Sequence, residues 1–318
     1  RLLRSIEKAS LSLQGNILVI LVFNHKVSTQ QSKKQDNFNL WDKIESKLIN
    51  KILLSNQKSY GVFGKYLNFD VLLVDRISKG KEFSDKFGVS LARKIAADLC
   101  LAFYDLGLIL FPWVYITDAD SVVPKNYFCI KFPKSVGACL YPFKHELCEK
   151  SDIYEKEAIR LYDLWLRYYV NSLDEVSSPY AFFSLGSIIC VSINIYASVR
   201  GFSRKKQAGE DFYFLNKVRK ISLIHSLECD AIKLSGRCSN RVPFGTGPSV
   251  IKISQLLRSG QSFKVYNPKV FGVLGLYISF VNKALESSFS YDNLSQLKDK
   301  NFSYVQFFGG RVQEKYNI

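Results

Sequence analysis

Short apolar runs alternate with helical spacings along the first part of the chain. The runs at 16–23, 69–74 and 112–117 are rich in β-branched and aromatic residues, as is typical of strands buried in a sheet. Between them, apolar residues recur at intervals of three and four, which predicts helices over 40–54 and 89–106. This order of elements predicts an α/β fold with a doubly wound, mostly parallel sheet flanked by helices.

The same patterns continue to about residue 285, without a linker before residue 260. We therefore expect one domain over 1–260 and a helical C-terminal extension over 261–318 packed on it. The first eight residues form an amphipathic pattern rather than a signal peptide. The remaining predicted elements are strands over 136–141 and 185–191, helices over 151–170, 212–219 and 270–285, a loop over 171–178, a short helix through Tyr196, and a helix that follows the basic segment 237–248 and ends near Leu257.

The most informative stretch is Val114–Ser121, where an apolar strand pattern ends in Asp118 and Asp120. In an extended backbone the i, i+2 spacing points both carboxylates to one side. Two hard oxygen donors suit Mg²⁺ or Mn²⁺, which take further ligands from water and phosphates. Taken alone, the D-x-D pattern is equally compatible with a polar turn after a strand.

Other motifs occur around this pair in a recognisable order. Leu91-Ala92-Arg93-Lys94 precedes it on a predicted helix, and Tyr115–Asp120 contains it. Gly186-Ser187, Val199–Phe202 and Ala208-Gly209-Glu210-Asp211 follow. Together, over about residues 16–219, these motifs resemble the family 2 glycosyltransferases, which have the GT-A fold.

The resemblance implies a nucleotide-diphospho-sugar donor bound across the strand ends. It implies Asp120 as the ligand of Mg²⁺ or Mn²⁺, and Asp118 facing the ribose or the metal shell. It places Asn24, Asp75 and Arg93 on the nucleotide side, with Asp75 accepting a hydrogen bond from the base and Arg93 facing the diphosphate. Asp75 capping a turn and Arg93 lying solvated on a helix remain alternatives.

The resemblance also implies an inverting transfer in which a carboxylate takes the proton of the acceptor hydroxyl. Asp211 is the candidate base and Glu210 its alternative, although an acidic helix cap is an open interpretation of both. His225 is a candidate further metal ligand. A basic, glycine-containing lid over the diphosphate is a further hypothesis, with Arg237 and Arg241 as nucleotide-sugar-binding residues beside Lys205, Lys206, Gly245 and Gly247.

Two departures from the family pattern refine the expectation. Lys94 stands where the family usually has Asn, and no Q-x-x-R-W motif of processive synthases occurs. We therefore expect transfer of a single sugar to a saccharide or lipid-linked acceptor. By analogy with relatives, the setting is the assembly of a cell-surface polysaccharide or lipopolysaccharide.

Charge and cysteine content narrow the setting further. The chain carries 44 Lys and Arg against 28 Asp and Glu, a net charge of +16, which favours anionic partners and leaves room for contact with an acidic membrane surface. Seven scattered cysteines without a C-x-x-C pair are typical of reduced thiols. We expect a cytoplasmic protein, and a location at the inner face of the membrane stays open.

Three rival functions stay open. Asp118–Val122 also fits the D-x-D-x-[TV] motif of haloacid-dehalogenase-like phosphatases, although that motif normally lies on the first strand of its domain. A sugar nucleotidyltransferase would carry a glycine-rich loop after the first strand, and residues 24–39 contain no glycine. A nucleic-acid-binding protein is less favoured, since the basic residues are spread out and no nucleic-acid motif occurs; no nucleic-acid partner is expected.

Overall fold

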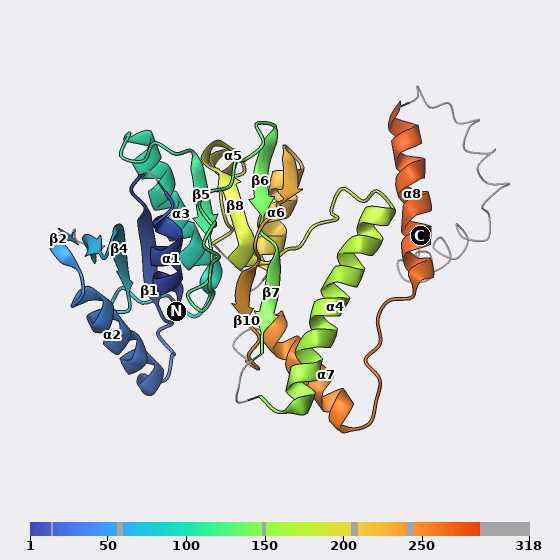
Figure 1. The fold of residues 1–318 in the computed structure, drawn as a ribbon, viewed down its shortest axis with the longest axis horizontal. Coiled ribbons are helices and arrows are strands. Elements are labelled where there is room, and N and C mark those ends of the chain that lie inside the picture. The colour runs from blue at the N-terminus through green and yellow to red at the C-terminus, as the bar shows by residue number, and fades with distance from the viewer. Residues whose placement is uncertain (14, 56–59, 148–150, 205–208, 240–244, 287–318) are drawn as a thin grey trace. The chain divides into compact units, whose positions relative to one another are not determined.

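The computed structural model describes residues 1–286 except 14, 56–59, 148–150, 205–208 and 240–244. The protein has an α/β fold with small mixed sheets (Figure 1). Its chain divides into two compact units. The first contains residues 1–164 and 182–263, and the second contains 165–181 with the described chain from 264.

The first sheet of the larger unit has the order β1-β4-β3-β2. Strand β1 (Leu18–Asn24) pairs parallel with β4 (Phe69–Arg76), so that Phe23 lies opposite Asp75. Strands β3 (Tyr60–Tyr66) and β2 (Ile49–Ser55) add antiparallel neighbours. Helices α2 (Gln31–Glu45) and α3 (Val89–Asp105) both contact β1.

The second sheet has the order β5-β8-β6-β9. Strands β5 (Trp113–Ile116) and β6 (Val136–Leu140) both run antiparallel to β8 (Ile189–Ser192), while β9 (Leu223–Ser226) is parallel to β6. Strands β5, β6 and β9 therefore end at the same edge. A third sheet pairs β7 (Phe143–Glu146) with β10 (Ile232–Ser235) in parallel.

Other helices complete the described chain. They are α1 (Leu2–Ser10), α4 (Ile153–Glu175), a 3₁₀ turn η1 (Gly186–Ile188), α5 (Ile193–Ser198), α6 (Glu210–Arg219), α7 (Thr246–Arg258) and α8 (Pro268–Glu286). The core of the larger unit lies on β4, β6 and β8, where Val71, Leu73, Ala138, Ile189 and Val191 have no exposed surface. No helix among the described residues combines the length and the apolar character needed to cross a membrane.

Most predicted elements are confirmed, and the differences have local causes. The helix expected over 40–54 ends at Glu45, and Ile49–Ser55 forms a fully exposed edge strand that begins with a bulge. Part of the expected loop 171–178 is helical, because α4 continues to Glu175. Pairing in the described sheets is mixed, so a mostly parallel sheet is not seen there.

Candidate functional site

The predicted metal pair lies in a turn directly after β5. Asp118 O accepts a hydrogen bond from the Ser121 N–H at 3.0 Å, and Val122 then pairs with Lys233 of β10 through hydrogen bonds of 2.9 and 3.0 Å. The backbone therefore turns at Asp118 instead of staying extended. Because of this turn, the carboxylates of Asp118 and Asp120 contact different arginines.

Arg93, on the first turns of α3, is the centre of a buried ionic cluster. Its Nη2 lies 2.5 Å from Asp118 Oδ1, and its Nη1 donates to Glu210 Oε1. Ser187 Oγ donates to Asp118 Oδ2 at 2.6 Å. The side chain of Arg93 is 11% exposed and that of Glu210 4%, whereas that of Asp118 is 41% exposed. Asp118 is thus the member of the cluster that faces solvent.

Asp211 is held beside this cluster at the first turn of α6. Gly209, at φ +71°, adopts the left-handed backbone that starts the helix, and the Phe212 N–H donates to Asp211 Oδ1 at 2.8 Å. The backbone N–H of Gly186 also donates to the Asp211 carboxylate and lowers its pKa. The candidate base and the D-x-D turn are therefore neighbours in space.

Burial and charge act in opposite directions in the cluster. Burial lowers the pKa of Arg93, but the carboxylates of Asp118, Glu210 and Asp211 outweigh it and raise that pKa above its usual value. Burial raises the pKa of Glu210 and of Asp211, and this exceeds the lowering by Arg93. Both acids thus hold their protons more tightly than ordinary carboxyl groups.

Gly186 is needed for the close approach of Arg93. A Cβ on Gly186 would lie 2.3 Å from Arg93 Cζ, far inside van der Waals contact. The adjacent Ser187 is the residue whose role the sequence does not reveal, because nothing in the Gly186-Ser187 motif predicts the hydrogen bond to Asp118. A short polar residue after a motif glycine was the available signal.

Asp120 pairs with Arg237, which follows β10. The distance from Arg237 Nη2 to Asp120 Oδ2 is 2.8 Å, and both side chains are more than a third exposed. This places Arg237 beside the D-x-D turn, as the nucleotide-binding prediction requires. Gly247 packs closely against Ser239. Three other members of the predicted lid, Lys205, Lys206 and Arg241, lie outside the described residues.

Asp75 and Asn24 lie at the carboxyl edge of the first sheet, on the adjacent strands β4 and β1. Asp75 Oδ1 accepts from the N–H groups of Ile77 and Ser78, each at 2.9 Å, and Oδ2 lies 3.1 Å from Lys81 Nζ. Burial raises the pKa of Asp75, but these hydrogen bonds outweigh it and lower the pKa overall. Asp75 thus caps a turn, the alternative that the sequence left open. Asn24 Nδ2 donates to Val22 O at 3.1 Å.

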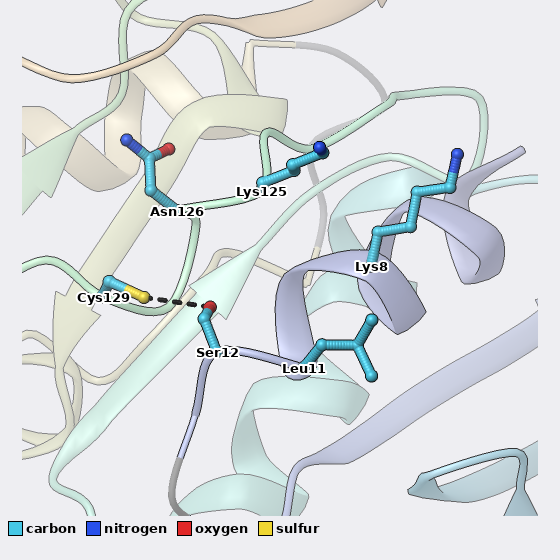
Figure 2. Close-up of a pocket in the computed structure, with 6 residues that line it drawn as sticks. All are labelled: Lys8, Leu11, Ser12, Lys125, Asn126 and Cys129. Atoms are coloured by element: carbon cyan, nitrogen blue, oxygen red, sulfur yellow. Dashed lines mark hydrogen bonds between the residues drawn. The ribbon is translucent and has the colours of Figure 1, made fainter.

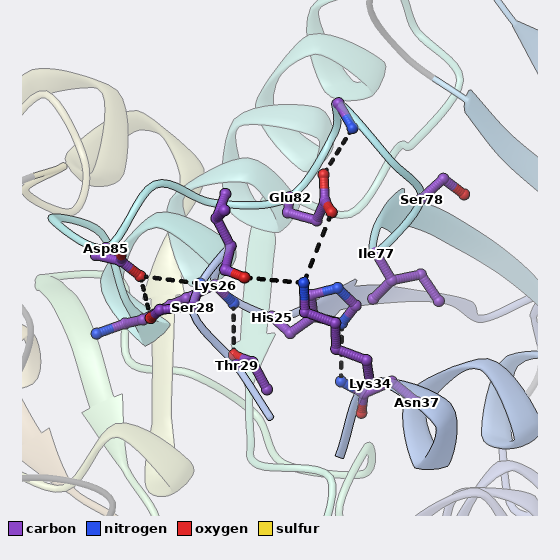
Figure 3. Close-up of polar contacts among 12 residues, drawn as sticks. His25, Lys26, Ser28, Thr29, Lys34, Asn37, Ile77, Ser78, Glu82 and Asp85 are labelled. Carbon is purple, nitrogen blue, oxygen red and sulfur yellow. Dashed lines mark hydrogen bonds and ion pairs between the residues drawn. The ribbon is translucent and has the colours of Figure 1, made fainter. Parts of the chain in front are cut away.

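The loops that follow β1 and β4 are tied to each other (Figure 3). His25 is buried, its Nδ1 lies 3.4 Å from Asn37 Nδ2, and its Nε2 has no hydrogen-bond partner among the described residues. Burial, and then the nearby Lys34, lower the pKa of His25. Lys34 Nζ lies 2.9 Å from Val27 O and 4.0 Å from Glu82 Oε1. A neutral, partly unsatisfied imidazole therefore lies at the edge where Asn24 ends β1.

His225 lies apart from the D-x-D turn. His225 is on β9, where it pairs with Cys139 of β6, and both β6 and β8 lie between β9 and β5. At about 4.8 Å per strand the separation is roughly 14 Å, whereas Mg²⁺ or Mn²⁺ needs ligands within about 2.2 Å. The structure thus places His225 too far from the pair to share a metal with it.

The donor set at the turn consists of two carboxylates. No group of three or more His, Cys, Asp and Glu suited to a metal occurs among the described residues. Mg²⁺ typically binds one or two protein carboxylates and takes its other ligands from water and substrate phosphates. Asp118 and Asp120 fit that mode chemically, with Arg93 and Arg237 as their partners in this state.

Comparisons with known proteins add no family to this geometry. The sequence matches no protein-family model and no curated protein.

Proposed function

We propose that the protein is a metal-dependent, inverting, non-processive glycosyltransferase with a GT-A-like larger unit. It would move one sugar from a nucleotide-diphospho-sugar to the hydroxyl of a saccharide or lipid-linked acceptor, in the assembly of a cell-surface polysaccharide or lipopolysaccharide at the cytoplasmic side. The proposal extends to a GT-A-type arrangement of the two mixed sheets around the D-x-D turn.

One observation carries the proposal. The A-R helix, the D-x-D turn, the Gly-Ser turn and the Gly-Glu-Asp helix start are separated by up to 117 residues, yet all four contribute to the cluster around Arg93. A motif order that arose by chance would not require its members to meet. Their convergence supports a shared chemical role.

Each side chain then has a definite task. Arg93 positions Asp118 and Glu210, because both of its Nη atoms are occupied by them. The Arg237 and Asp120 side chains are both more than a third exposed, so a diphosphate can replace Asp120 as the partner of Arg237. A bound Mg²⁺ or Mn²⁺ would supply Lewis-acid stabilisation of the negative charge on the departing nucleoside diphosphate.

The proton of the acceptor is assigned to Asp211. Glu210 is almost fully buried and paired with Arg93, which leaves it poorly placed to reach an acceptor. Asp211 is partly exposed, and its raised pKa makes it a stronger base than an ordinary aspartate. The carboxylate of Asp211 therefore accepts the proton as the acceptor oxygen attacks the anomeric carbon.

The phosphatase alternative is less well supported. It needs Asp118 as a free nucleophile, whereas Oδ1 is bound by Arg93 and Oδ2 by Ser187. A carboxylate held at both oxygens suits a positioning or ligating role better than nucleophilic attack.

A thermal-shift screen of nucleotide sugars, with and without Mn²⁺, tests the proposal. Asp120→Asn should lose the Mn²⁺-dependent rise in melting temperature, while Asp211→Asn should keep it and lose about a hundredfold or more of turnover. Asp230→Asn, an exposed aspartate on the same unit, is the matched control. Normal turnover by Asp211→Asn would refute the base assignment, and no shift with any nucleotide-diphospho-sugar would refute the function.

A further inference from the structure

The larger unit exposes an apolar surface at the edge of the second sheet opposite the D-x-D turn. We define it as the loop face: Leu108, Leu110 and Phe111 before β5, with Lys131 and Lys134 before β6. Leu108 is 71% exposed, Leu110 86% and Phe111 51%. Three large apolar side chains so exposed on one short loop are unusual for a surface that meets only water.

The two loops meet because β5 and β6 begin at the same edge. Both strands are antiparallel to β8, and their first residues lie at the same end of the sheet in Figure 1. Phe132 of the second loop stacks on Trp113 with ring centroids 4.1 Å apart and contacts Phe111 at 6.2 Å. The two loops are therefore in contact through Phe132, which Lys131 and Lys134 flank closely in the sequence.

The charged residues within the two loops, 106–112 and 121–135, are all lysines. Residues 121–135 contain three lysines and no Asp or Glu, and residues 106–117 contain no charged residue. All three lysines are exposed, and none of the ion pairs found among the described residues involves them. The two loops thus combine exposed leucines with exposed lysines that form no ion pair among the described residues.

A basin beside the loop face adds a further cation (Figure 2). It has a volume of about 610 Å³ and is lined by Lys8 and Leu11 of the N-terminal segment and by Lys125 and Cys129 of the second loop, among others. Ser12 also lines it, with Ser12 Oγ 3.2 Å from Cys129 Sγ. Two lysines above an apolar lining are a chemically suitable place for an anionic headgroup.

We propose that the loop face docks on an anionic lipid bilayer, with its leucines in the interfacial layer and its lysines among the headgroups. Apolar side chains next to unpaired lysines match that layered chemistry. A second copy of this chain is disfavoured because lysines would oppose lysines. The inference depends on this surface alone and does not require sugar transfer.

Vesicle co-sedimentation of the full chain tests the docking. The protein should bind vesicles of equal parts phosphatidylglycerol and phosphatidylcholine, and should not bind phosphatidylcholine alone. Lys131→Ala/Lys134→Ala should weaken binding about 25-fold, since each lysine near an anionic surface contributes about a fivefold factor. Leu108→Ser/Leu110→Ser should weaken it by roughly tenfold or more.

The controls keep charge and apolar loss equal away from the face. Lys47→Ala/Lys51→Ala removes two exposed lysines at the β2 edge of the first sheet, and Leu53→Ser/Ile153→Ser removes two apolar residues that are 63% and 75% exposed. Both should bind as the unmodified chain does. Binding that is absent at low salt, or that the controls weaken as much as the face variants, would overturn the proposal. If the chain bound an acidic protein but did not bind vesicles, that result would also overturn the proposal.

Discussion

The Arg93–Glu210 pair should be costly to break from one side and nearly neutral to remove as a whole. Arg93→Leu leaves the Glu210 carboxylate, only 4% exposed, without its cation. Removing one partner of a buried pair costs about 3–5 kcal/mol, while replacing both by apolar groups is often neutral. Asp118 adds little to the cost, because at 41% exposure water screens its charge.

The loss of stability in Arg93→Leu should depend on pH, and the pKa of Glu210 decides in which direction. Burial already raises the pKa of Glu210 in the folded chain, and loss of Arg93 raises that pKa further. A carboxyl group whose folded pKa exceeds its unfolded value stabilises the fold fully below the unfolded pKa, and this contribution is lost as pH rises through the folded pKa. The stability deficit of Arg93→Leu should therefore be smaller near about pH 5 than near about pH 8.

Tryptophan fluorescence can restrict the measurement to the larger unit. Of the three tryptophans, Trp41 and Trp113 lie there and Trp165 lies in the second unit. In a Trp165→Phe background, urea unfolding of Arg93→Leu, Glu210→Leu and the double variant completes a double-mutant cycle.

Lys94→Leu is the control, on the same helix and paired at 3.1 Å with the half-exposed Asp98. Its expected cost is about 1 kcal/mol or less. A cost below about 1 kcal/mol for Arg93→Leu, or additive single effects in the cycle, would contradict the buried-pair reasoning.

Three further outcomes follow from the site. Gly186→Ala should destabilise the larger unit by about 1–3 kcal/mol in the same urea assay, since the new Cβ would lie 2.3 Å from Arg93 Cζ; an unchanged midpoint would contradict this. Arg237→Ala should tighten binding of Mn²⁺ alone in calorimetry, because it frees Asp120; weaker binding would argue against competition. Turnover should fall on acidification at a pH above that of an ordinary aspartate, since the pKa of Asp211 is raised; a flat pH profile would exclude Asp211 as the base.

The sequence predicts the secondary structure correctly wherever the apolar residues follow a single strand or helix pattern. The runs that became β1, β4 and β5 are apolar on both faces, and the spacing in α3 is regular over the whole helix, so each has one interpretation. The sequence does not predict strand β2, because Ile49, Ile52 and Leu53 are exposed on a sheet edge and do not alternate with buried residues. The predicted helix over 40–54 extends the helical spacing of α2, where Trp41 is buried, into residues that form β2.

The site was only partly readable, because ion pairing depends on distant residues. The sequence identified Asp118, Asp120, Arg93, Glu210 and Asp211, but not which charge each would contact. The i, i+2 spacing puts both carboxylates on one side only in an extended backbone, and the hydrogen bond from the Ser121 N–H to Asp118 O turns the chain instead. That bond and the Val122 pairing with β10 involve no pattern that a linear sequence displays.

The D-x-D turn and the loop face lie at opposite ends of strand β5. Ile116, at its carboxyl end, leads into Asp118, while Trp113, at its other end, stacks under Phe132 of the loop face. At about 3.3 Å per residue the four-residue strand separates the two edges by roughly 13 Å. A face that docks on lipid would therefore direct the ionic cluster away from the bilayer, towards a water-soluble donor. It follows that Leu108→Ser/Leu110→Ser should detach the protein from vesicles without slowing transfer to a soluble acceptor, whereas a lipid-linked acceptor must extend its sugar well beyond the headgroups to reach Asp211.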